Sequence, residues 1–147
     1  MGLFTSFDTS ASGLTAQRYR MDIISQNVAN ANTTRTADGT PYRRKVVVFE
    51  EKGGRTSFDS VLGRVKDNYA GKGVRVSKVT EDQWTEMKKV YDPSHPDANE
   101  DGYVLYPNVN TVTEMTNMID ASRSYEANVT AFNASKNMLL KTLEIGK

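Results

Sequence analysis

Apolar side chains recur every seven residues toward the C-terminal end of the chain, which predicts a long helix over residues 111–143. One row of this repeat is wholly apolar and consists of Met118, Tyr125, Phe132 and Leu139. A companion row, three residues earlier, is interrupted by two polar residues and reads Met115, Ser122, Val129, Lys136 and Leu143. Because a helix of about 48 Å exceeds what the core of a small domain needs, we expect it to pack against another long helix and against other chains.

The start of this helix carries a recognisable signal. Thr111 and Glu114 have the spacing of a capping box, in which the side chains at the first turn bond to each other's backbone N–H groups. No Pro or Gly follows until Gly146, so nothing in the sequence interrupts the helix before its end.

A second heptad pattern lies near the N-terminus and predicts a helix over residues 9–30. Its main row is Phe7, Leu14, Met21 and Val28, and its companion row is Ala11, Ile24 and Ala31, interrupted by Arg18. The helix is predicted to end in an Asn-rich run, where short polar side chains cap the last turn or bond a neighbouring subunit. We expect the two terminal helices to pair as a parallel or antiparallel coiled coil.

The middle of the chain changes from a helical to a strand-like pattern. β-branched and aromatic runs predict four strands, at residues 42–51, 73–80, 83–91 and 103–106. Loops are expected at 53–73 and at 92–102, which contains two prolines. The predicted fold class is therefore α+β, with an N-terminal helix over 1–33, a small β-rich middle over 34–111 and a C-terminal helix over 112–147.

Charge is concentrated in that middle region. Residues 34–111 carry 25 of the 37 charged side chains, and the net charge is only +1. The charge-poor ends are expected to be covered either by partners or by each other. A near-neutral chain without a long basic run gives no reason to expect nucleic-acid binding. We also expect no secretory signal peptide, no membrane insertion and, with no cysteine, no disulfide.

Few residues could carry chemistry. His95 is the only histidine, and we interpret it as a solvated loop residue, so no enzyme and no cofactor are predicted. The run from Asp97 to Gly102 matches the first half of a calcium loop, but Asn108 stands where the bidentate Glu should be. A weak calcium site is therefore an alternative hypothesis. The basic run 43–45 has the charge to hold a phosphate group, but we interpret it as a solvated strand edge.

Several segments resemble the flagellar axial proteins of bacteria, which include rod, hook and hook-associated proteins. The N-terminal part carries SGLTAQR at 12–18 and SQNVAN at 25–30. The remaining segments are similar to the proximal rod family: PYRR at 41–44, DPSHPDAN at 92–99, GYV at 102–104, PNVN at 107–110, ASRSYEANV at 121–129 and LEIGK at 143–147. The resemblance covers nearly the whole chain.

The resemblance implies a structural, self-assembling subunit of the basal-body rod, the drive shaft for flagellum-dependent motility. It implies export through the flagellar type III apparatus, a location outside the cytoplasmic membrane, and terminal helices paired in an inner, D0-like tube. The expected partners are copies of the same chain, other rod and hook-basal-body proteins, and the export apparatus. A cytosolic coiled-coil adaptor is the remaining alternative.

The heptad rows and the helix exit together predict an assembly interface. Its residues are Leu14, Met21, Ile24, Asn27, Val28, Asn30, Asn32, Met115, Met118, Tyr125, Val129, Phe132, Leu139 and Leu143.

Overall fold

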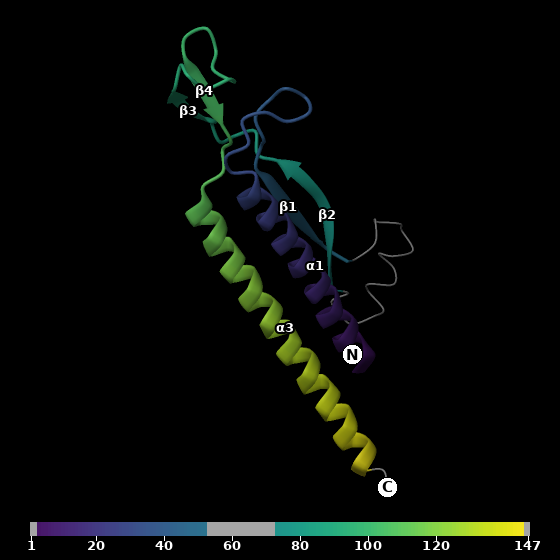
Figure 1. The fold of residues 1–147 in the computed structure, drawn as a ribbon. Helices are drawn as coiled ribbons and strands as arrows, with labels where there is room; N and C mark the ends of the chain where they lie inside the picture. Colours follow the sequence, from purple (N-terminus) through teal and green to yellow (C-terminus); the bar gives the residue numbers. More distant parts are fainter. Residues whose placement is uncertain (1–2, 53–72, 146–147) are drawn as a thin grey trace, which may run out of the picture. The chain divides into compact units, whose positions relative to one another are not determined.

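The computed structural model in Figure 1 describes residues 3–52 and 73–145, as two long helices and four short strands. In chain order the elements are α1 (Leu3–Ala29), β1 (Lys45–Glu51), β2 (Val74–Glu81), β3 (Lys88–Tyr91), β4 (Tyr103–Tyr106) and α3 (Thr111–Ile145). The predicted α+β class is confirmed. Most of the loop expected at 53–73 lies outside the described residues.

Both helices were predicted, with different accuracy at their ends. α3 starts at Thr111 as predicted and continues two residues beyond the predicted end. α1 starts six residues earlier than predicted, at Leu3, and continues through Gly13 without interruption. In the part of the chain that the structure describes, neither helix has an apolar stretch long enough to cross a membrane.

The chain forms two compact units, each of which contains part of both helices. Unit 1 comprises residues 1–19, 49–77 and 121–147, and unit 2 comprises residues 20–48 and 78–120. These units are not the three sequence segments proposed above, because contacts between distant parts of the chain define them.

In unit 1, α1 and α3 pack in opposite directions. The ring of Phe7 meets the ring of Phe132 edge to face, with centroids 4.9 Å apart. Further along α1, Gly13 lies so close to α3 that a Cβ atom added to it would stand 2.7 Å from Oδ1 of Asn128. Phe7 comes before Gly13 whereas Phe132 comes after Asn128, so the two helices run antiparallel in this unit.

Gly73 ties the start of β2 to α1 within unit 1. Its φ of +86° is one that residues with a Cβ rarely adopt, and an added Cβ would collide with the hydroxyl of Ser12. That hydroxyl also accepts the backbone N–H of Val74 at 3.0 Å. The glycine therefore allows the backbone to approach the helix closely.

Replacement of Gly73 by alanine is expected to lower the free energy of unfolding by about 2 kcal/mol, from backbone strain together with the collision. Denaturant unfolding of the full chain measures the loss. Gly39→Ala is the matched control, because Gly39 has a similar φ of +76° but open space around its Cα. Equal losses in both variants would show that contact with Ser12 adds nothing.

The strands form two separate two-stranded sheets, one of β1 with β2 and one of β3 with β4. β3 and β4 are antiparallel, with Val90 opposite Val104, and Val104 is fully buried. β3 is shorter than the predicted strand over 83–91. The residues before it turn instead around the carboxylate of Asp82, which accepts the backbone N–H groups of Trp84 and Thr85.

The buried core of the described residues is small and unusually polar. Six apolar residues are buried: Ala16, Ile23, Ile24, Tyr42, Val104 and Ala121. Four polar or charged residues are buried as well: Asn27, Asn108, Glu114 and Ser135. Since buried polar groups are costly unless they are paired, the fold depends on how well these side chains satisfy one another.

In both helices the most buried row lies beside the predicted rows, although Ile24 of the predicted companion row is also buried. In α1 the buried row contains Gly13 and Asn27, one residue before Leu14 and Val28 of the predicted row. In α3 it contains Glu114, Ala121 and Ser135, one residue before the predicted companion row. Small residues let the helix backbones approach closely, and polar residues pair across the contact. The wholly apolar row of α3 is half-buried beside this row.

Candidate functional site: a buried polar clamp

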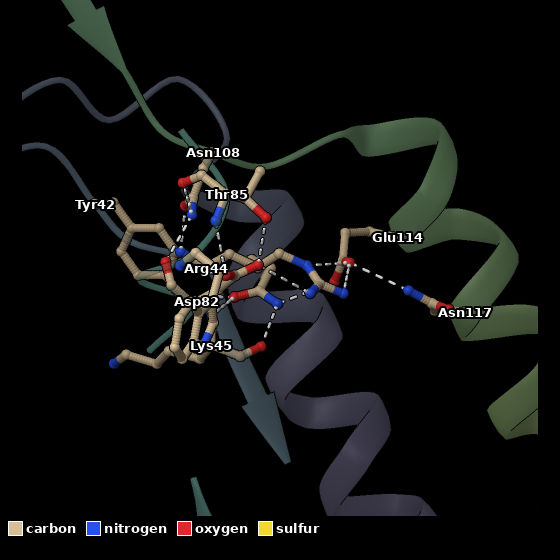
Figure 2. Close-up of polar contacts among 10 residues, drawn as sticks. Tyr42, Arg44, Lys45, Asp82, Thr85, Asn108, Glu114 and Asn117 are labelled. Atoms are coloured by element: carbon tan, nitrogen blue, oxygen red, sulfur yellow. Dashed lines mark hydrogen bonds and ion pairs between the residues drawn. The ribbon is translucent and has the colours of Figure 1, made fainter. Parts of the chain in front are cut away.

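Unit 2 contains a connected set of polar side chains that we call the clamp, formed by Asn27, Tyr42, Arg44, Asp82, Asn108 and Glu114. All of them except Asn27 are labelled in Figure 2. These residues come from the end of α1, the segment before β1, the turn after β2, and the link from β4 into the start of α3. The clamp thus joins four parts of unit 2 that are far apart in the sequence.

The start of α3 is capped by Asn110 and not by the predicted capping box. The Oδ1 atom of Asn110 accepts the backbone N–H groups of Val112 at 3.0 Å and Thr113 at 3.3 Å, which are otherwise unpaired in the first turn. This leaves Glu114 free of a capping role. Its carboxylate points away from the helix end and into unit 2, so the capping-box prediction was wrong about this residue.

Glu114 is only 1% exposed, and all its hydrogen-bond partners are donors. Its Oε1 accepts from Nε and Nη2 of Arg44 at 2.9 and 2.8 Å and from Nδ2 of Asn117 at 3.2 Å. Its Oε2 accepts from Nδ2 of Asn27 at 2.9 Å. A carboxylate has only acceptors, so it can accept from all four of these N–H groups. A side chain with a donor of its own would place that donor against one of them and leave both unpaired.

Asn27 connects α1 to the start of β1. Its Oδ1 accepts the backbone N–H of Lys45 and the hydroxyl of Tyr42, both at 2.9 Å. Its Nδ2 donates to the carbonyl of Lys45 at 2.8 Å as well as to Glu114. The Asn27 amide therefore pairs with both the N–H and the carbonyl of Lys45, as a neighbouring strand would. Because its oxygen and its nitrogen each have two partners, the orientation of the amide is fixed.

Burial raises the pKa of the Tyr42 hydroxyl, and the nearby carboxylates of Glu81 and Glu114 raise it further. The hydroxyl therefore stays protonated and donates to Asn27 throughout the neutral range.

Asn108 and Asp82 complete the clamp on the strand side. Oδ1 of Asn108 accepts the backbone N–H of Arg44 at 2.8 Å, and its Nδ2 donates to the carbonyls of Asp82 and Thr85 at 2.8 and 3.2 Å. The Asp82 carboxylate lies 3.6 Å from Nη1 of Arg44. Arg44 therefore lies between two acidic groups, and its interpretation as part of a solvated strand edge was wrong.

The pKa of Asp82 is held below its usual range, chiefly by the backbone N–H and the hydroxyl of Thr85, with smaller contributions from the Trp84 N–H and the charge of Arg44. A carboxylate whose pKa is lower in the folded state stabilises the fold fully above the unfolded pKa of about 3.9. That stabilisation is lost as the pH falls through the folded pKa.

We therefore expect the stability of the wild-type chain to decline more steeply with acid than that of Asp82→Asn as the pH falls below about 5. Denaturant unfolding at a series of pH values measures both profiles. Parallel profiles would show that Asp82 contributes nothing to acid sensitivity.

The structure separates the predicted interface residues into two groups. Those covered or half-covered within the chain are Leu14, Met21, Ile24, Asn27, Asn30, Met118, Tyr125, Val129, Phe132 and Leu139. Those that stay exposed are Val28, Asn32, Met115 and Leu143. At the helix exit, Asn27 enters the clamp, whereas Nδ2 of Asn30 donates to the carbonyl of Gln26 at 2.9 Å as a local cap.

The calcium-like loop has other partners in the structure. The Asp97 carboxylate accepts the hydroxyl of Thr34 at 2.8 Å and lies 3.7 Å from the guanidinium of Arg35. Asn99 accepts the backbone N–H of Tyr103 at 2.7 Å. His95 is half-buried, and its Nδ1 accepts the backbone N–H of Asp97 at 3.1 Å. The side chain is therefore not fully solvated, whereas the sequence predicted that it would be. Within residues 3–52 and 73–145, no group of acidic or histidine side chains is arranged to hold a metal ion.

Sequence reasoning did not identify the clamp, although the segments that carry the family resemblance contain most of it. Tyr42 and Arg44 belong to the PYRR segment, Asn108 to PNVN, and Asn27 to SQNVAN. These segments thus have a shared structural role, because their side chains meet in unit 2.

Comparisons with known proteins agree with this resemblance. The family model described as "Flagella basal body rod protein" matches residues 7–35, and the one described as "Flagellar basal body rod FlgEFG protein C-terminal" matches residues 100–145. The chain is 52% identical to the flagellar basal-body rod protein FlgC of Bacillus subtilis, over the full length of both. It is 46% identical to the FlgC of Borreliella burgdorferi, over 99% of this chain and 98% of the relative. It is 43% identical to the FlgC of Salmonella typhimurium, over the full length of both.

Proposed function

Because this chain belongs to the FlgC family of flagellar basal-body rod proteins, we propose that its clamp fixes the terminal helices in the geometry needed for rod assembly. The chain is a structural subunit of the flagellar basal body, not an enzyme, and it assembles with other rod and basal-body proteins.

The single observation that supports the proposal is the buried carboxylate of Glu114 with its complete set of donors. In a rod that transmits torque, each subunit must hold one conformation under load. Directional hydrogen bonds fix the position of one element against another more strictly than apolar contact does, because a shifted position leaves buried groups unpaired. The clamp thus sets where α3 begins relative to the end of α1 within unit 2.

The predicted interface is proposed to consist mainly of helix residues that the isolated chain leaves exposed. Met115 and Leu143 are 61% and 67% exposed, and both are large apolar residues on α3. A helix whose apolar side chains remain in water after folding gains free energy when a partner covers them. The half-buried residues of the apolar row would instead shape the pair of helices that neighbours contact.

We also propose export through the flagellar type III apparatus to a site outside the cytoplasmic membrane. The small, polar core of the described residues supports this proposal. A chain that buries few large apolar side chains has a low free energy of unfolding, so it is easily unfolded for export. The division into segments 1–33, 34–111 and 112–147 belongs to the same proposal, with the helical ends forming the inner tube.

Leu143→Asp tests the interface without disturbing the fold. Because Leu143 is exposed, the free energy of unfolding should change by less than about 0.5 kcal/mol. The variant is produced in a bacterium that lacks its own copy of this protein, and we expect loss of swimming and absence of the chain from purified basal bodies. Asn137→Asp, an exposed α3 position that receives the same charge, is the matched control and should assemble normally.

Two results would contradict the proposal. Normal swimming of Leu143→Asp would show that this residue faces no partner. Failure of the wild-type chain to enter basal bodies, with all of it in the cytosol, would favour a cytosolic adaptor.

A further inference from the structure

Among the residues that the structure describes, Oε1 of Gln17 on α1 is the one buried side-chain oxygen or nitrogen that has no hydrogen-bond partner. An amide oxygen is a strong acceptor, and it gives up hydrogen bonds to water when it is buried. Without a donor in exchange, it destabilises the folded state. Native proteins contain few such groups, so each one calls for an explanation. Gln17 lowers the stability of the unit that contains it, which is unit 1.

Gln17 lies on the face of α1 that packs against α3. It follows Gly13, the residue in close contact with Asn128 of α3, by about one helical turn. Its neighbour Ala16 is buried, so this part of the helix is covered. The Gln17 side chain as a whole is half-buried, but its oxygen is shielded from water. The unpaired atom therefore weakens unit 1 at the contact between its two helices.

The described part of unit 1 has little apolar burial to offset this cost. Of the six buried apolar residues, the two that belong to unit 1, Ala16 and Ala121, are both alanines. An alanine contributes less on burial than a larger apolar side chain, because the stabilisation follows the apolar area removed from water. Unit 2 has the larger buried side chains and also the clamp, in which Asn27, Asn108 and Glu114 are all paired. We therefore expect unit 1 to open more easily than unit 2.

We propose that Gln17 is a built-in weak point, which lets the helix pair of unit 1 open and re-form against neighbouring subunits while the clamp keeps unit 2 folded. The inference rests on the proposed function, in which neighbours contact the exposed apolar residues of α3, such as Leu143 of unit 1. Segments that move in function come from the least stable parts of a fold, because opening them requires little free energy. A helix pair with an unpaired acceptor at its contact meets this condition.

Hydrogen exchange of the purified full chain tests the weak point. Gln17→Met keeps a side chain of similar length and removes its polar end. The amides of residues 5–19 and 121–145 should then be protected about tenfold more than in the wild type, with no change in unit 2. Gln26→Met is the matched control, because it makes the same change at an exposed position of α1, and it should leave both units unchanged. Gln17→Glu places a charge at the buried site and should lower protection in unit 1.

Two results of the exchange experiment would overturn the proposal. Protection that is unchanged or lower in Gln17→Met would show that the amide stabilises the helix pair. Unchanged protection in Gln17→Glu would show that the end of the side chain lies in water.

The consequence for assembly is measured in a bacterium that lacks its own copy of this protein. Basal bodies from cells with Gln17→Met should contain about threefold less of the chain than those with the wild type or Gln26→Met, because a more stable helix pair opens less often. Normal incorporation of a better protected Gln17→Met chain overturns the role in assembly. Retention of that variant in the cytosol does so as well, since export would then be the affected step. Absence of the wild-type chain from basal bodies would instead contradict the rod function itself.

Discussion

Replacement of Glu114 by glutamine is expected to lower the free energy of unfolding of unit 2 by about 3 kcal/mol. Glutamine has nearly the same shape, but its amide presents donors to a site where every partner already donates. The substitution also leaves Arg44 without the carboxylate that it contacts at 2.8 Å. Hydrogen exchange across residues 20–48 and 78–120 measures the loss directly, because it reports opening of the unit separately from the rest of the chain.

Glu126→Gln is the matched control, since it makes the same change on an exposed position of the same helix. It should alter exchange in unit 2 by less than about 0.5 kcal/mol. A second comparison replaces both Arg44 and Glu114 by methionine. If a lost pair causes the effect, the double variant should be less destabilised than the sum of the single methionine variants, because neither charge is then left unpaired. Additive losses would indicate that the two side chains act independently.

Local sequence signals predicted the elements of this fold well. The β-branched run Val46 to Val48 lies in β1, and the residues of β4 were predicted without error. The C-terminal heptads predicted α3, and the capping-box spacing gave its correct first residue, although Asn110 makes the cap. These successes share a cause, because strand and helix periodicity depend on neighbours within a few positions.

The heptad rows account for part of the helix contact, since Phe7 and Phe132 both belong to them, but heptad reasoning looks for large apolar residues and passes over the others. The contacting residues that lie outside the heptad rows are Gly13 and Asn128 in unit 1, and Asn27 and Glu114 in unit 2. None of them counts as apolar. Small residues permit close backbone approach and buried polar residues pair, but both kinds look like interruptions when a repeat is read from a single sequence.

The clamp was missed for a related reason. Glu114 bonds Asn27 across 87 positions and Arg44 across 70, and no local pattern connects such distant residues. Glu114 also satisfied a local motif, since it follows Thr111 by three positions. A residue can fit a capping box and still be used elsewhere when a neighbour, here Asn110, caps the helix instead. Glu114 therefore pairs with the distant Arg44 instead of capping the first turn of α3.

Phe132→Asp is expected to separate α1 from α3 in unit 1 and to abolish swimming. The Phe132 ring meets Phe7 at 4.9 Å and 78°, an edge-to-face contact that a carboxylate cannot replace. Loss of this packing, together with a charge on the apolar contact, should cost about 3 kcal/mol. Hydrogen exchange over residues 5–19 and 121–145, with basal-body purification, measures the stability of the helix pair and its assembly separately.

Ala131→Asp is the matched control because it introduces the same charge at the adjacent, exposed position of α3. Its helix pair should keep wild-type protection, so any loss of swimming there would reflect contact with a neighbouring subunit. Phe7→Asp should reproduce the defect of Phe132→Asp, since it removes the other half of the same ring pair. If Phe132→Asp swims normally while Phe7→Asp does not, Phe7 has a role outside this pair. If both swim normally, the rod neighbours, rather than the aromatic contact, hold the two helices together.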